Sequence, residues 1–265
     1  MDGAASSSAR RAGLSARLAA HLRALAGPDR DARTNRDLAV LLALTAGIVN
    51  SVGFMAIGLY TSHMTGLTAM LADGLALGAA RVALLCVTGI GSFVLGAACC
   101  ALLFNWARRR GLRSRYAIVL LVEAALVLLI GLLAHELTSA ERSWALIALL
   151  GLTMGLQNAI ITKISDAQIR TTHVTGMVTD IGIELGKLVY PVRRDDPDPV
   201  RPQLDRLGLH SLLVGTFFAG GVIGALAYQV IGFVTVVPTA SILLVFASIP
   251  LIEDLRTLSP ARPRR

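Results

Sequence analysis

The chain has 265 residues, of which 54% are hydrophobic and only 16% are charged, and its formal net charge is +8. Water-soluble globular domains carry about 25% charged residues. This composition therefore leaves too few charges to cover a soluble surface, and it excludes a soluble enzyme.

Six apolar stretches are long enough to cross a bilayer, which takes about 20 residues per helix. In chain order they cover residues 38–60, 82–106, 116–135, 143–162, 209–232 and 233–252. Glu123 is the one acidic residue inside any of them. A soluble helix would carry a polar face and a barrel strand would alternate, whereas these stretches are continuously apolar. We predict an all-α integral membrane protein with six transmembrane helices.

Basic residues gather at the ends of these stretches. Seven Arg precede the first stretch, five lie between Arg108 and Arg115, seven Lys or Arg lie between Lys163 and Arg206, and four follow the last stretch. Six spans with both termini in the cytoplasm place every cluster inside, as the positive-inside rule expects. We therefore expect a multi-pass protein of the bacterial inner membrane with cytoplasmic N- and C-termini, and no nucleic-acid partner.

The tails are basic and the middle of the chain is membrane-bound. Residues 1–37 form an N-terminal tail in which leucines recur at helical spacing, at Leu14, Leu18, Leu22 and Leu25. This spacing predicts an amphipathic helix on the membrane surface, with an organellar transit peptide as the alternative. Residues 253–265 form a basic C-terminal tail.

Between the tails, the two halves of the membrane region resemble each other. Residues 38–142 are the first repeat, and residues 143–252 are the second, which contains a polar cytoplasmic insert at 191–208. Three groups recur in order: Leu44, Thr45, Gly47 and Asn50 as Leu152, Thr153, Gly155 and Asn158 (offset 108); Thr61, His63, Thr65 and Gly66 as Thr171, His173, Thr175 and Gly176 (offset 110); and Thr88, Ser92 and Gly96 as Thr216, Gly220 and Gly224 (offset 128). Because each copy holds three spans, the second copy enters the membrane from the opposite side, so we predict two inverted three-span repeats.

A shorter apolar segment follows the first span of each repeat, at 61–80 and 171–190. If both segments crossed the membrane, the five Arg around Arg110 would lie outside, so we predict re-entrant or interfacial helices. Each begins with Thr-x-His-x-Thr-Gly, whose hydroxyl groups can cap a helix start, and a helix start favours anions. The element is either a binding cradle or a bent loop that satisfies its own backbone.

The candidate site residues fall into two groups. The substrate-binding candidates are polar or small residues at paired positions: Asn50, His63, Thr65, Gly66, Asn158, His173, Thr175 and Gly176. We expect them around one central site at the repeat interface, where secondary transporters bind their substrates; the alternative is that the two Asn only bridge helices. The coupling or gating candidates are ionisable: Glu123, Asp180, Glu184 and Lys187.

These ionisable candidates occupy two settings. Glu123 is flanked by apolar residues, so it is protonated, paired inside the bundle or close to water. Asp180, Glu184 and Lys187 share one face of the second short helix with His173. That face is either solvated or involved in proton coupling or gating.

No cofactor, metal site or catalytic residue is expected. Cys86, Cys99 and Cys100 all lie in the second stretch and match no zinc spacing or disulfide framework. We interpret them as small packing residues. A membrane enzyme would need a nucleophile with its base, a metal set or paired carboxylates on one side, and the sequence supplies none of these.

Three motifs carry a resemblance to a known family. Thr-Ser-His-Met-Thr-Gly at 61–66, Gly-Leu-Gln-Asn at 155–158 and Thr-Thr-His-Val-Thr-Gly at 171–176 resemble the YoaK family of bacterial membrane proteins, DUF1275, over about residues 38–252. The resemblance implies a small permease. We expect a secondary transporter or permease for an unknown small solute, with a non-transporting membrane scaffold or sensor as the alternative. The expected partners are the lipid bilayer and that solute, and the sequence is also compatible with a homo-oligomer.

Overall fold

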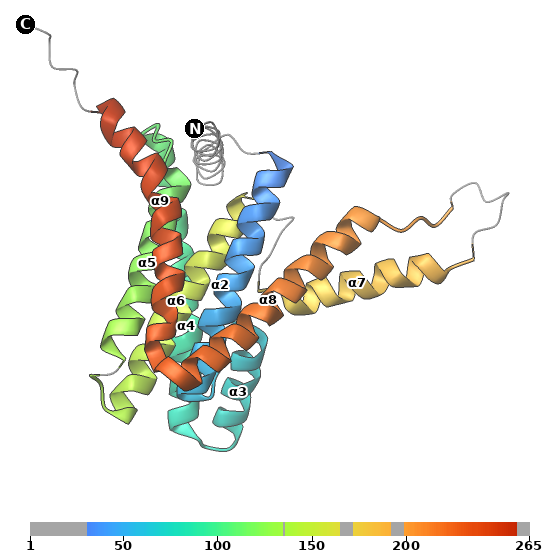
Figure 1. Ribbon diagram of the computed structural model, residues 1–265. Coiled ribbons are helices and arrows are strands. Elements are labelled where there is room, and N and C mark those ends of the chain that lie inside the picture. The colour runs from blue at the N-terminus through green and yellow to red at the C-terminus, as the bar shows by residue number, and fades with distance from the viewer. Residues whose placement is uncertain (1–30, 135, 165–171, 192–198, 259–265) are drawn as a thin grey trace, which may run out of the picture.

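The computed structural model describes residues 31–134, 136–164, 172–191 and 199–258, and the regular structure in these ranges is entirely helical (Figure 1). The predicted N-terminal amphipathic helix and the end of the C-terminal tail lie outside the described residues. In chain order the helices are α2 (Ala32–Ile57), α3 (Met64–Ala76), α4 (Ala80–Arg109), α5 (Arg115–Leu133), α6 (Ser139–Ile164), α7 (Val174–Val189), α8 (Leu204–Ile231), the 3₁₀ helix η1 (Gly232–Thr235) and α9 (Val236–Leu258).

Five helical segments in the described part of the chain are long and apolar enough to cross a membrane. Four of them correspond to α2, α4, α5 and α6, and the fifth is a run of 53 residues over α8, η1 and α9. In that run the chain reverses direction after Gly232, which has a positive φ of 58° (Figure 1). The short helices α3 and α7 have 13 and 16 residues and are not among the candidate spans. The prediction of an all-α membrane protein is thus supported.

The ends of the helices differ from the ends of the apolar runs. The carboxylate of Asp31 accepts hydrogen bonds from the Thr34 side chain (2.6 Å) and backbone N–H (2.7 Å), which lower the pKa of Asp31 and cap α2 six residues before the predicted start. The helix ends at Gly58, whose φ of 70° suits glycine. At the other end of the chain α9 continues to Leu258, so the first six residues of the predicted C-terminal tail, 253–258, are helical.

Close crossings between helices depend on glycine. Gly47 of α2 lies against the backbone of Phe217 in α8, and Gly155 of α6 lies against the backbone of Phe93 in α4. An added Cβ at either glycine would overlap the facing carbonyl oxygen. Small residues allow this approach between membrane helices.

At the same two crossings, two further glycines lie on the opposite helix and face the backbone of α6 and α2. Gly96 of α4 lies against Leu152 of α6, and Gly220 of α8 lies against Leu44 of α2. The first long helix of each half therefore packs along the second long helix of the other half, α2 on α8 and α6 on α4. The matched contacts relate α4 to α8 by 124 residues, so the sequence-derived offset of 128 is wrong by about one helical turn. Small residues recur every fourth position on this stripe, so a shift of four preserves the pattern.

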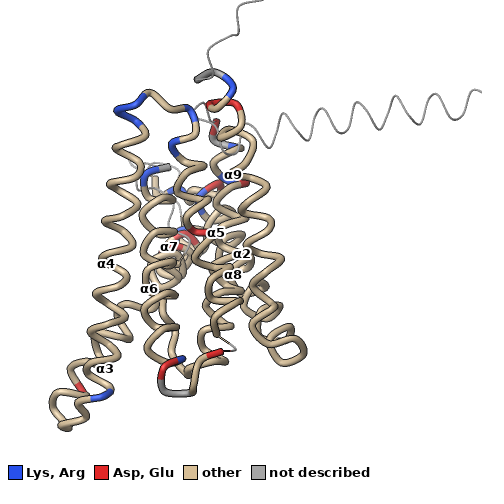
Figure 2. Tube along the Cα trace, turned by 90° about the vertical axis from the view of Figure 1, so that its left-hand side faces the viewer, with Lys and Arg blue, Asp and Glu red and all other residues tan. Residues whose placement is uncertain are grey.

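The outside of the bundle is apolar and its charges lie at the ends. Exposed residues on the outer faces include Leu95 and Leu102 of α4, Phe218 and Val230 of α8 and Val245 of α9. Figure 2 shows Lys and Arg concentrated at one end, along the connection between α4 and α5. Asp254 of α9 binds this connection, where it accepts hydrogen bonds from the backbone N–H groups of Arg113 (3.3 Å) and Ser114 (2.8 Å). The C-terminal end of α9 and the basic connection therefore share one end of the molecule.

Candidate functional site

The first repeated element is a loop tied to α2 by Asn50. The chain leaves α2 at Gly58 and enters α3 at Met64. The buried Asn50 side chain accepts hydrogen bonds through Oδ1 from the hydroxyl of Ser62 (2.9 Å) and from its backbone N–H (3.3 Å). Because Asn50 lies on α2, these bonds hold the non-helical segment against the helix that precedes it.

The second half repeats this anchor with Asn158. Its Oδ1 accepts a hydrogen bond from the Thr172 hydroxyl (2.5 Å), and its Nδ2 donates to the carbonyl oxygen of Met154 (2.7 Å). Thr172 occupies the position that Ser62 has in the first half, directly before the histidine. Both Asn side chains thus serve their own loops in this structure, which satisfies the polar amide inside an apolar bundle.

The Thr-x-His-x-Thr-Gly residues lie at the starts of α3 and α7. His63 and His173 precede these helices, and their backbone carbonyls accept from the N–H groups of Leu67 (3.0 Å) and Met177 (3.1 Å). Neither N-cap histidine makes a side-chain cap bond to its helix, and Thr171 lies outside the described residues. Among the other members of the element, Thr65, Gly66, Thr175 and Gly176 lie at or near the protein surface, whereas Thr61 is buried.

The two histidine loops lie on opposite sides of the point where α2 and α6 cross. The side-chain amide of Gln157 donates to the carbonyl oxygen of Leu42 (3.2 Å), whereas Gly53 faces Leu150, so the two helices run antiparallel. Asn158 is therefore level with the region of Leu42. Asn50 lies eight residues further along α2, which corresponds to about 12 Å. The two Asn residues are therefore offset along the bundle, and each contacts its own loop.

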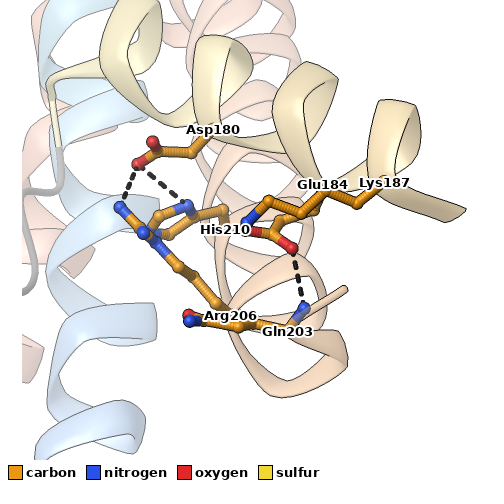
Figure 3. A network of polar contacts seen from close by, with 6 residues as sticks. All are labelled: Asp180, Glu184, Lys187, Gln203, Arg206 and His210. Atoms are coloured by element: carbon orange, nitrogen blue, oxygen red, sulfur yellow. Dashed lines mark hydrogen bonds and ion pairs between the residues drawn. The ribbon is translucent and has the colours of Figure 1, made fainter. Parts of the chain in front are cut away.

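The charged face of α7 packs on α8, where Glu184 is buried while Asp180 and Lys187 remain partly exposed to solvent (Figure 3). Asp180 lies 3.0 Å from the guanidinium of Arg206 and 3.5 Å from Nδ1 of His210. The buried carboxylate of Glu184 accepts from Lys187 Nζ (2.8 Å) and from the backbone N–H of Gln203 (2.7 Å). Both hydrogen bonds lower the pKa of Glu184, and the bond from Lys187 has the larger effect. The α7–α8 hairpin, which projects sideways from the bundle in Figure 1, is thus held together by polar contacts.

The α8 members of this network were missed in the sequence. Gln203 and Arg206 lie at the end of the polar insert and His210 follows it, and none of the three was among the predicted site residues. Arg206 and His210 are four residues apart, as are Asp180 and Glu184, so each pair occupies one helix face. This matching spacing is the signal that could have found them.

Glu123 lies in the core of the bundle beside an amide that was also missed in the sequence. Both carboxyl oxygens are fully buried and have no hydrogen-bond partner among the described residues. Gln157 of α6 is the neighbouring polar side chain, and its Oε1 is likewise without a partner there. Gln157 belongs to the Gly-Leu-Gln-Asn motif at 155–158, of which only Gly155 and Asn158 recur in the other half.

The described residues contain no group of three His, Cys, Asp or Glu side chains that could hold a metal ion. The thiols of Cys86, Cys99 and Cys100 are free, and Cys86 and Cys100 are buried. Cys100 packs in the same core cluster as Leu38, Leu120 and Ile160.

Comparison with protein-family models gives one match, over residues 38–249, to a family described as "Protein of unknown function (DUF1275)". No curated protein and no solved structure matches the chain. The matched residues begin in α2 and end in α9, so they include both Asn-anchored loops, the α7–α8 hairpin and the buried Glu123. The chain belongs to the DUF1275 family.

Proposed function

We propose that this protein is a secondary transporter for a small solute, built from two inverted three-span repeats. The observation that carries the proposal is the matched pair of polar breaks. Each half has a long helix, a loop tied back by an Asn, a short helix and a second long helix packed on the other half. Repeats of this kind with interrupted helices are typical of secondary transporters.

In this proposal the six spans are α2, α4, α5, α6, α8 and α9. The antiparallel course of α2 and α6 supports the inversion, because equivalent helices of inverted repeats run in opposite directions. The basic end of the bundle faces the cytoplasm, following the positive-inside rule. Reporter fusions at Arg110 and Glu136 test this arrangement, with a cytoplasmic signal expected at Arg110 and an external one at Glu136. The reverse pair of signals contradicts it.

The two histidine loops are the proposed solute contacts. His63, Thr65 and Gly66 form one contact, and His173, Thr175 and Gly176 form the other, each beside the start of a non-spanning helix. Because the loops lie about 12 Å apart along the bundle, a solute passes from one to the other and does not touch both at once. The α2–α8 and α4–α6 crossings are tight, so the motion is carried by α2 moving against α6.

Flux into proteoliposomes tests the transport proposal directly. The purified protein is reconstituted and challenged with a panel of labelled metabolites, beside Ser62→Ala and Thr172→Val, which remove the hydroxyl donors to Asn50 and Asn158. Flux is expected with the wild type and is expected to fall with both variants. Thr68→Val and Thr179→Val are the matched controls, because their hydroxyls bond only to the preceding helical turn. A folded wild type that moves none of the panel favours a membrane scaffold or sensor.

A further inference from the structure

The carboxyl group of Glu123 is the most deeply buried carboxyl group in the described part of the bundle, and it lies where α5 meets α6. It is 0% exposed and so is Gln157. The nearest core residues on the same two helices are apolar: Leu120, Ala124, Leu156 and Ile160. None of the ion pairs between described residues includes Glu123, and neither of its oxygens accepts a hydrogen bond there. An ionised carboxylate in this setting would be buried without compensation, which proteins avoid.

The orientation of Gln157 decides which proton state fits. The Nε2 group of Gln157 donates a hydrogen bond to the carbonyl oxygen of Leu42 (3.2 Å), which ties the side chain to α2. Its Oε1 has no hydrogen-bond donor among the described residues. An ionised carboxylate only accepts hydrogen bonds, so an ionised Glu123 cannot satisfy the Oε1 of Gln157. A protonated carboxyl can donate its hydroxyl to Oε1, which satisfies Gln157 and removes the charge from Glu123.

Other titratable groups lie around this pair. Cys100 of α4 lies in the core cluster that contains Leu120 and Ala124, the α5 residues on either side of Glu123. Lys163 is half-buried with its Nζ over the ring of Phe104 (5.2 Å). On α9, Asp254 binds at Ser114, nine residues before Glu123 and roughly 13 Å away along α5.

We propose that Glu123 carries the coupling proton of this protein and that Gln157 holds it in the protonated form. The inference rests on the proposed transport function. Gln157 is bonded to α2 and Glu123 lies on α5, so a movement of α2 against α6 breaks the Leu42 bond and turns the amide away. Glu123 then loses its acceptor and releases the proton toward water at the basic end, which begins about 12 Å away at Arg115.

Infrared spectroscopy of the purified protein in nanodiscs tests the protonated state without a substrate. A carbonyl-stretch band of a protonated carboxylic acid is expected at neutral pH and is expected to disappear reversibly when the folded protein is made alkaline. Glu123→Gln loses the band, and the matched control Glu136→Gln, at an exposed carboxyl, keeps it. Gln157→Met keeps the band but shifts its frequency, because the acceptor is gone. A wild-type band that is absent, that survives Glu123→Gln or that vanishes on adding Na⁺ overturns the proposal.

Loss of the band in Glu123→Gln is not expected to come from misfolding of the variant. The glutamine side chain introduced by Glu123→Gln has the shape of a protonated glutamic acid, and its amide can donate to Gln157 Oε1. This variant should therefore elute as the wild type does in size exclusion. A band that titrates only when the protein unfolds marks a permanent structural acid, and this also overturns the proposal.

Coupling is then measured with whichever labelled metabolite the wild type transports. Glu123→Gln is expected to exchange internal for external solute as the wild type does, while its accumulation under an imposed pH gradient falls to the level of empty liposomes. If the variant accumulates solute as the wild type does, the inference fails and the transporter proposal stands. If the wild type moves no metabolite, the transporter proposal fails and with it the coupling role.

Discussion

The crossing of α4 and α6 requires a residue without a side chain at position 96. In Gly96→Ala the new Cβ would lie 2.8 Å from the carbonyl carbon of Leu152 and 3.0 Å from its Cα, whereas ordinary contacts begin at 3.4 Å. All these atoms belong to the backbone of α6, so no side-chain rotation relieves the overlap. The two helices must move apart, and the contacts along the whole crossing weaken.

The expected cost follows from two opposing effects. Overpacking of this kind costs about 1–3 kcal/mol, and a rigid backbone neighbour favours the upper end. Alanine recovers about 1 kcal/mol through its better helix propensity. We therefore expect Gly96→Ala to lower the free energy of unfolding by about 2 kcal/mol, which for a chain of this size lowers the melting temperature by about 4–8 °C.

Gly91→Ala is the matched control, because it lies on the same helix and nothing stands within 4 Å of its Cβ position. It keeps the propensity gain without the overlap, so its melting temperature should equal or exceed that of the wild type. Gly220→Ala and Gly215→Ala repeat the comparison in the second half, where Gly215 is also open. Thermal unfolding in detergent, followed by circular dichroism, measures all four. Equal losses for Gly91→Ala and Gly96→Ala would refute the assigned crossing.

Three further outcomes are expected. Asn50→Ala and Asn158→Ala each leave a loop hydroxyl without its acceptor and should lower the free energy of unfolding by about 1–3 kcal/mol; an unchanged melting temperature in either contradicts the anchor. Asp254→Ala removes the acceptor of the Ser114 N–H and should cost a similar amount, and it should expose the α4–α5 connection to trypsin at its arginines. The pKa of Glu184 is lowered from its usual 4.5, so its contribution is present above that value and is lost as pH falls through the lowered pKa. Protection of α7 from hydrogen exchange, corrected for intrinsic rates, should therefore hold from neutral to mildly acidic pH and fall only below it, and Glu184→Gln should remove this acid-dependent step.

Helix existence could be predicted from the sequence because apolar run length is a local property. The bounds were less accurate where charge and helix end do not coincide. Arg33, Arg36 and Asp37 lie before the first apolar run, but they already belong to α2, which begins directly after its N-cap Asp31. Glu253 and Asp254 likewise lie after the last apolar run but still belong to α9. A charge at a membrane helix end interrupts hydropathy without interrupting the backbone.

The site was harder to predict because its partners are distant along the chain. A buried Asn must have a partner, and this much follows from Asn50 and Asn158 alone. That the partners are Ser62 and Thr172, and not a solute, depends on how each loop folds back. The contacts of Asp180 with Arg206 and of Glu184 with Gln203 join α7 to the far end of the polar insert, so spacing on α7 alone could not separate a solvated face from a paired one.

The two halves have matching helix crossings but different polar side chains at them. This difference affects the proposed coupling of proton movement to transport. The position equivalent to Gln157 in α2 is Val49, which is buried among apolar residues. The acceptor for a protonated carboxyl therefore exists on one side of the α2–α6 crossing and has no counterpart on the other. A motion that is symmetric in its backbone would then be asymmetric in its protonation, because only one of its two end states breaks the Gln157 bond. One such pair per chain couples one proton to each cycle. A ratio of two protons per solute, measured from the gradient at which net flux reverses, would require a second ionisable group in the path.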